Sequence, residues 1–115
     1  MKYEYHAKII NVVDGDTIDA ELRAVVDIGF HMVYQVTFVK RLRLLGVDCP
    51  ESRGATREEG KAASDFTRRE LLDRQVVIRT EKGDAFDRWL CDVRVEGVHF
   101  NRRLVDEGFA VPFMT

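Results

Sequence analysis

Five ionisable side chains in this sequence are of the types that cleave phosphodiester bonds. Asp16 and Asp48 offer the hard carboxylate oxygens that Ca²⁺ prefers as ligands. Arg43 and Arg88 carry planar guanidinium groups, which bind a phosphate through paired hydrogen bonds. Glu51 is of the type that takes a proton from an attacking water molecule. A metal site, charge stabilisation and a base together are the parts needed for metal-dependent hydrolysis of a phosphodiester bond.

The segments that carry these residues also have simpler interpretations. Residues 14–17 form a hairpin-turn sequence, and taken alone that interpretation is favoured. Arg88 precedes Trp89, an arrangement that is often only a stacked surface pair. The segment 43–51 favours a functional site, because it delivers an arginine and two carboxylates from a strand end into a loop stiffened by Pro50.

Periodic patterns predict the elements that must position these residues. Alternating apolar residues and turn signals predict strands over residues 7–13, 17–25, 31–45, 76–80 and 89–95, with a short return at 98–100. A helix is expected over residues 57–74, and a second, short helix is expected to be capped by Asn101 and terminated by Gly108. This order predicts a mainly β fold with α, a five-stranded OB-type Greek-key barrel with one long and one short helix packed on it. Periodicity alone leaves a general α+β domain open.

The second hairpin of the predicted barrel is long, because an extended run continues from His31 to Leu45. One face of this run is apolar and Arg43 lies on the other. Apolar residues also gather around the turn, namely Val25, Val26, Ile28, Phe30 and Met32. We expect them to fill the barrel of a monomer. The alternative is a dimer in which this hairpin is the buried surface.

The bulk composition indicates one globular domain over residues 1–115, with 45% apolar and 33% charged residues. A net charge of −2 opposes binding of nucleic acid, although a bound cation and local arginines would offset it. No signal peptide or membrane span is recognisable, so we expect a cytoplasmic protein, with a mature secreted form as the alternative. Cys49 and Cys91 are expected to be free thiols.

Four motifs occur in an order that resembles the staphylococcal nuclease (thermonuclease) family. The sequence reads DGDT at 14–17, RLLGVDCPE at 43–51, DAFDR at 84–88 and NRRLVDEG at 101–108. Each motif is weak alone, but four in order are specific, and they span nearly the whole chain.

The resemblance implies an OB-type barrel with a helix packed on it, and a role for each matching residue. Asp16, Asp48 and the main-chain carbonyl of Cys49 would be ligands of Ca²⁺. Arg43 and Arg88 would bind phosphate, and Glu51 would be the general base. In the family, water attacks phosphorus in line, the 5′ oxygen leaves, and DNA or RNA is left with 3′-phosphate ends.

The chain departs from the family pattern at several positions. Cys49 replaces a threonine, Asp87 a glycine, Phe86 a tyrosine and Ala85 a lysine. Asp87 also places a negative charge beside Arg88.

Aromatic and hydroxyl side chains near the predicted site complete the expectations. We expect Thr17 and Phe86 to contact substrate. Phe113 has two equal interpretations, closing the end of the barrel or stacking on a base, whereas Phe109 is expected in the core.

Two further functions stay open at the level of sequence. One is a catalytically weak or inactive nuclease-like module that binds nucleic acid or protein. The net negative charge and Asp87 favour this inactive module, and the full set of catalytic residue types opposes it. The other is an interaction domain that uses the long hairpin from Ala20 to Arg43 as its surface.

Overall fold

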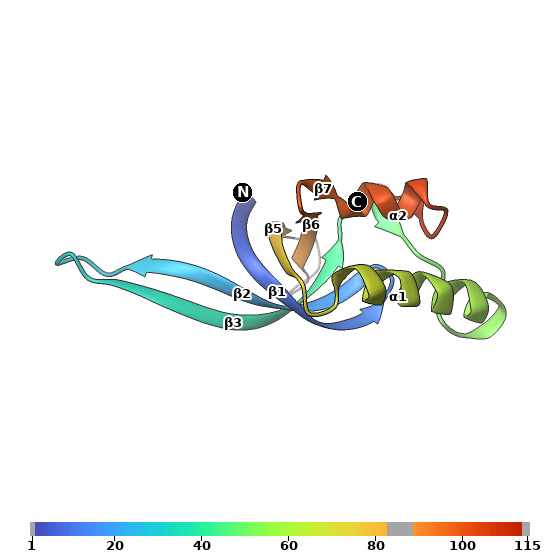
Figure 1. The fold of residues 1–115 in the computed structure, drawn as a ribbon, viewed down its shortest axis with the longest axis horizontal. Helices are drawn as coiled ribbons and strands as arrows, with labels where there is room; N and C mark the ends of the chain where they lie inside the picture. Colours follow the sequence, from blue (N-terminus) through green and yellow to red (C-terminus); the bar gives the residue numbers. More distant parts are fainter. Residues whose placement is uncertain (1, 83–88, 114–115) are drawn as a thin grey trace.

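The computed structural model describes residues 2–82 and 89–113, and its main feature is a closed β-barrel (Figure 1). The barrel strands are β1 (Lys2–Asp14), β2 (Thr17–Asp27), β3 (Val33–Leu44), β5 (Gln75–Lys82) and β6 (Trp89–Val95). Antiparallel pairing runs in the order β3-β2-β1-β5-β6. Parallel pairing of β3 with β6, from Leu42 opposite Trp89 to Leu44 opposite Cys91, closes the ring. The predicted mainly β fold is therefore confirmed.

Shorter elements extend this barrel at one end. They are β4 (Val47–Asp48), β7 (Val98–His99), β8 (Val111–Pro112), the 3₁₀ turn η1 (Gly54–Thr56) and the helices α1 (Arg57–Leu71) and α2 (Phe100–Asp106). β4 and β8 form a small antiparallel pair of their own. No helix in the described part of the chain is long and apolar enough to cross a membrane.

Helix α1 packs against the barrel through one apolar face. Ala63, Phe66, Thr67 and Leu71 are all buried, as the sequence pattern predicts. The helix ends at Leu71 rather than residue 74, because Leu72 leaves the helical region with ψ of 132° and Asp73 follows in a left-handed conformation with φ of 63°. Phe66 stacks on Phe109 with ring centroids 4.5 Å apart, which confirms the core position of Phe109.

The predicted capping role of Asn101 is wrong. His99 is the N-cap of α2, and Asn101 lies inside the helix with only 2% of its surface exposed. Its side chain leaves the helix and binds the backbone of neighbouring segments. The predicted terminator is confirmed, since Gly108 follows the last turn with φ of 83°.

The expectation that the long hairpin fills the barrel is also wrong. The ends of β2 and β3 leave the barrel as a projecting arm, seen at the left of Figure 1. Its turn residue Phe30 is 92% exposed and Val25 is 71% exposed. The arm stretches the molecule to 57 × 28 × 23 Å. The radius of gyration is 15.0 Å, against about 13 Å for a compact chain of this length.

Candidate active site

Asp16 is the buried centre of the site. It lies in the turn between β1 and β2, and its side chain is only 7% exposed. Its Oδ2 accepts a hydrogen bond from the Cys49 main-chain N–H at 3.0 Å. Its Oδ1 accepts one from the Thr17 hydroxyl at 3.2 Å, and its carbonyl accepts the Leu44 N–H at 2.8 Å. These bonds hold the carboxylate in one place and tie the turn to the ends of β3 and β4.

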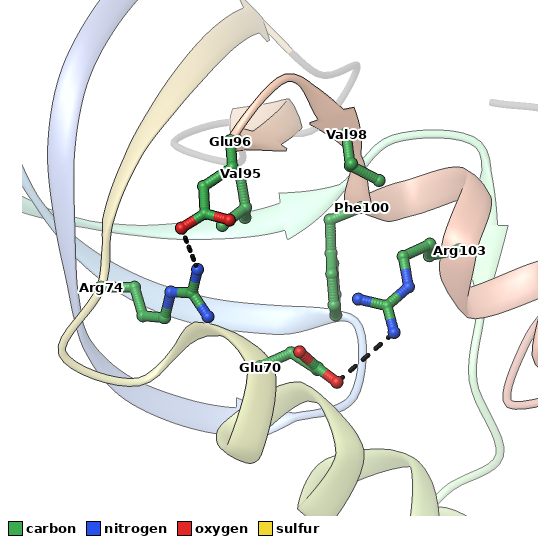
Figure 2. Close-up of a pocket in the computed structure, with 7 residues that line it drawn as sticks. All are labelled: Glu70, Arg74, Val95, Glu96, Val98, Phe100 and Arg103. Carbon is green, nitrogen blue, oxygen red and sulfur yellow. Dashed lines mark hydrogen bonds and ion pairs between the residues drawn. The ribbon is translucent and has the colours of Figure 1, made fainter.

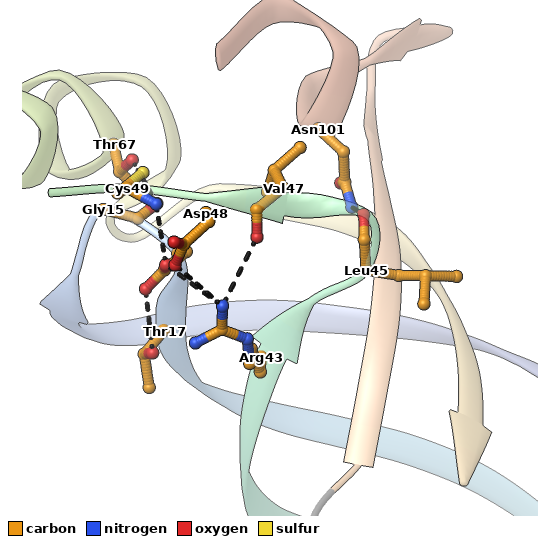
Figure 3. Close-up of polar contacts among 10 residues, drawn as sticks. Gly15, Thr17, Arg43, Leu45, Val47, Asp48, Cys49, Thr67 and Asn101 are labelled. Carbon is orange, nitrogen blue, oxygen red and sulfur yellow. Dashed lines mark hydrogen bonds and ion pairs between the residues drawn. The ribbon is translucent and has the colours of Figure 1, made fainter. Parts of the chain in front are cut away.

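The turn can lie this close to α1 because residue 15 is glycine. A Cβ on Gly15 would come within 2.9 Å of Ala63 Cβ and of Cys49 Sγ. Thr67 of α1 donates a buried hydrogen bond of 2.8 Å to the Gly15 carbonyl, which Figure 3 shows beside the site. The Asp-Gly-Asp segment therefore does more than connect β1 to β2, because α1 packs against the barrel at this segment.

Arg43 contacts both aspartates, and Figure 3 shows its guanidinium pointing toward Asp48. It leaves the end of β3, and its Nη2 is 3.1 Å from Asp48 Oδ1 and 3.7 Å from Asp16 Oδ2. The same nitrogen is 3.5 Å from the Val47 carbonyl oxygen. Within the described residues, the side-chain hydrogen bonds and ion pairs of Arg43 all run through Nη2. None of these residues accepts a hydrogen bond from Nε or Nη1, which are also donors.

Asp48 forms the solvent side of the cluster. Its side chain is 47% exposed, whereas those of Arg43 and Asp16 are 19% and 7% exposed. The backbone of Asp48 is held by β8, where it pairs with Val111. One carboxylate is thus buried and fixed and the other faces water, and the same guanidinium nitrogen contacts both.

Cys49 contributes its backbone to the site while its thiol is buried. The residue is 8% exposed, and its sulfur lies close to Gly15, as described above. Burial raises the pKa of the Cys49 thiol to about 12, and the negative charges of Asp16 and Asp48 contribute less to this rise. The thiol therefore stays protonated at neutral pH and serves as a packing group.

This burial predicts that Cys49 is unreactive in the folded protein. A thiol reagent at neutral pH should label neither Cys49 nor the buried Cys91 until denaturant is added, because the thiolate is the reactive form. Intact-mass spectrometry before and after denaturation measures this directly. Rapid labelling of Cys49 without unfolding would contradict the buried position.

Glu51 lies next to this cluster along the chain, but its carboxylate does not touch it. The side chain is 77% exposed, and among the described residues its ion pair is with Arg53 at 4.0 Å. Its backbone is fixed more firmly, because the Thr56 hydroxyl donates to its carbonyl at 2.8 Å. A Cβ on Gly60 would lie 2.4 Å from the Glu51 carbonyl carbon, so only glycine lets α1 pack on this loop.

The predicted substrate-binding residues divide into two groups. Thr17 is bonded to Asp16, and the ring of Phe113 lies 5.8 Å from the Arg43 guanidinium. Phe113 is 45% exposed and its N–H is bonded to the Gly46 carbonyl, so the ring flanks the cluster and remains accessible. Arg88 and Phe86 lie outside the described residues.

Asn101 supports the site by hydrogen bonds to the backbone of neighbouring segments, a role that the sequence did not predict. Its amide nitrogen donates to the carbonyls of Leu45 and Cys91 at 3.0 Å, and its oxygen accepts the Val93 N–H at 3.0 Å (Figure 3). These bonds join α2 and β6 to the turn between β3 and β4. Leaving one such buried group unpaired costs about 1–3 kcal/mol.

The donor set suits a hard cation, although it is sparse. Among the residues that the structure describes, no three His, Cys, Asp or Glu side chains gather as a metal cluster. Asp16 and Asp48 nevertheless share one positive neighbour, Arg43, and their charges both act on Cys49. The two carboxylates are oxygen ligands of the kind that Ca²⁺ takes, with waters completing its coordination.

A second hollow elsewhere on the surface lacks such a charge arrangement. It is lined by the ion pairs Arg74–Glu96 at 3.1 Å and Arg103–Glu70 at 3.4 Å, with Phe100 between them (Figure 2). Each arginine there is paired with one glutamate, so this hollow has no excess charge to attract a phosphate. The candidate active site is the cluster around Asp16, where two aspartates contact Arg43.

Comparisons with known proteins identify the family of this chain. The family described as staphylococcal nuclease homologue matches residues 41–114. The thermonuclease of Staphylococcus hyicus is 35% identical over 108 residues, which cover 90% of this chain and 56% of that protein. The thermonuclease of Staphylococcus intermedius is 34% identical over 104 residues, covering 86% and 54%.

An uncharacterized protein of Bacillus anthracis is 27% identical over 110 residues, covering 90% of this chain and 45% of that protein. The chain spans about half the length of the curated relatives it matches. The family match nevertheless covers most of the chain and includes Arg43, Asp48 and Glu51. The chain belongs to the staphylococcal nuclease family.

Proposed function

We propose that this chain is a nuclease that hydrolyses phosphodiester bonds of DNA or RNA. The observation that carries the proposal is the position of Arg43. Both aspartates contact its guanidinium through Nη2, at 3.1 and 3.7 Å, and no residue in the described part of the chain accepts from Nε or Nη1, so these donors could bind a phosphate. The two related thermonucleases support the same reaction class.

The aspartates and a main-chain carbonyl are the groups that would hold a calcium ion. Asp16, Asp48 and the carbonyl of Cys49 would be its protein ligands. Such an ion supplies Lewis-acid stabilisation of a negatively charged phosphate. It would also offset the two carboxylate charges, which otherwise repel an anionic substrate.

The remaining chemistry falls to three charged side chains. Glu51 accepts a proton from the attacking water, and its exposed position leaves it free to turn toward a bound substrate. Arg43 and Arg88 stabilise the charge that develops on the phosphoryl oxygens. The 5′ oxygen leaves, so the products carry 3′-phosphate ends.

The alternative is a nuclease-like module that binds nucleic acid or protein without cutting. The favouring observation is that Arg43 and Glu51 already have opposite charges as neighbours, in Asp48 and Arg53. Measuring the binding of deoxythymidine bisphosphate distinguishes an inactive module from an enzyme only when nuclease activity is assayed as well. An active site of this type should bind that nucleotide and Ca²⁺ cooperatively.

Digestion assays test the proposal. Plasmid DNA and a structured RNA should be degraded with Ca²⁺, spared with EDTA, and degraded again when excess Ca²⁺ is added back. Products should need phosphatase treatment before a polymerase can extend their 3′ ends. Intact substrates under every cation tried would leave the binding module as the function.

A further inference from the structure

The projecting arm carries an apolar face that nothing in the described structure covers. Side chains directly opposite each other in β2 and β3 share a face. The face that supplies the core through Ile18, Ala20 and Leu22 continues along the arm as Ala24 and Val26, opposite Val36 and Tyr34. Val26, Tyr34 and Val36 are 43%, 52% and 41% exposed. The core pattern thus continues beyond the end of the core.

The outer edge of β3 in this arm is also unpaired. Among the described residues, β3 pairs with β2 on one side, and on the other side only residues 42–44 pair, with β6. From Val33 to Arg41 the outer backbone groups meet no described strand. The segment Val33–Val39 contains no charge and no proline, the features that normally protect an edge strand from pairing with another chain.

The sequence of this edge is complementary to itself. Residues 33–39 read Val-Tyr-Gln-Val-Thr-Phe-Val, the same order of residue classes in both directions, with Val36 at the centre. In an antiparallel pair of two such strands, Val33 faces Val39, Tyr34 faces Phe38, and Gln35 faces Thr37. Two-fold symmetry requires this kind of self-complementary surface.

We propose that two copies of this chain pair through β3, antiparallel and centred on Val36, to form a symmetric dimer. Main-chain hydrogen bonds then satisfy both edges, and the apolar faces of the two arms become continuous. Phe38 makes edge-on contacts with Tyr5 and Trp89 at 5.9 and 6.5 Å. Tyr34 of each copy therefore extends this aromatic cluster of the other copy.

Charge on the arm is consistent with a second copy as the occupant. Its charged residues lie outside the central segment, as Asp27 at one end of the apolar stretch and Lys40 and Arg41 at the other. In the antiparallel register, Asp27 approaches the end at which the other copy carries its basic residues. The corresponding free edge of β2 beyond Arg23 is shorter and contains Asp27, so β3 is the better pairing edge.

Sedimentation velocity and light scattering on the full chain test the dimer. The wild type should show twice the monomer mass of 13.3 kDa as concentration rises. Val36→Lys places two charges on the symmetry axis and should give the monomer mass with an unchanged far-ultraviolet circular dichroism spectrum. Val98→Lys, at a similarly exposed valine in β7, should leave the dimer intact.

Cysteine cross-linking tests the register even if the lysine variant folds poorly. Val36→Cys chains should form a disulfide dimer, because residues opposite each other in antiparallel strands meet the distance that a disulfide needs. Gln35→Cys and Thr37→Cys chains should cross-link readily only when mixed. The natural cysteines are both buried and add little background. A monomer mass at every concentration, or a dimer indifferent to Val36→Lys that forms no such cross-links, would overturn the proposal.

Discussion

An Arg43→Lys variant should retain the fold and lose about two to three orders of magnitude in kcat/KM on nucleic acid, as when one charge-stabilising donor group is removed. Lysine keeps the positive charge beside Asp16 and Asp48, so the buried carboxylate is still compensated. Lysine lacks the planar fork whose further donors we propose bind the phosphate. The loss should therefore appear in turnover and leave the melting temperature nearly unchanged.

The chain itself supplies a matched control for this substitution. Arg41 lies two residues earlier on the same face of β3, 64% exposed and paired with Asp19 at 2.8 Å. Arg41→Lys makes the same chemical change beside a carboxylate, outside the cluster. Steady-state kinetics with plasmid DNA should show near wild-type turnover for Arg41→Lys. If Arg43→Lys matched it, Arg43 would have no special part in the reaction.

The convergence at Asp16 could be predicted because each residue follows a local signal. A turn delivers Asp16, a strand end delivers Arg43, and a short loop after that strand delivers Asp48. Closing a barrel brings those strand ends together at one rim. Their meeting around one guanidinium is therefore a consequence of a fold that the sequence pattern already indicated.

The supporting residues were missed because their function depends on tertiary packing. Gly60 looks like an ordinary weak position in a helix, and only the helix position shows that the Glu51 backbone passes beneath it. Asn101 is of a residue type that often caps helices, yet its side chain hydrogen-bonds three backbone groups that are far apart in the sequence. Neither of these contacts produces a periodic pattern in the sequence from which it could be predicted.

The hairpin was misassigned for a related reason. Alternation identifies the apolar face of a strand correctly, and the observed register places Tyr34, Val36 and Phe38 on one face as expected. Alternation does not show how far along that strand the barrel extends. Phe38 lies within reach of the core and Tyr34 lies beyond it, although both follow the same pattern.

Replacing Glu51 with glutamine should lower kcat by about 10²- to 10⁴-fold, the usual contribution of a positioned base. Glutamine keeps the shape of the side chain and removes its ability to take a proton from water. The side chain is 77% exposed, so this change should leave thermal stability intact. Single-turnover digestion with saturating Ca²⁺ isolates the chemical step from binding.

The geometry around Glu51 determines how that result is to be understood. Its backbone is fixed by Thr56 and by the close approach of Gly60, while its carboxylate extends into solvent toward Arg53. A base held in this way reaches the reacting water only once substrate is bound, so Glu51→Gln should alter kcat more than KM. Glu59→Gln, an equally conservative change at an exposed position of α1, should alter neither. A wild-type kcat in both variants would contradict the role of Glu51 as the base.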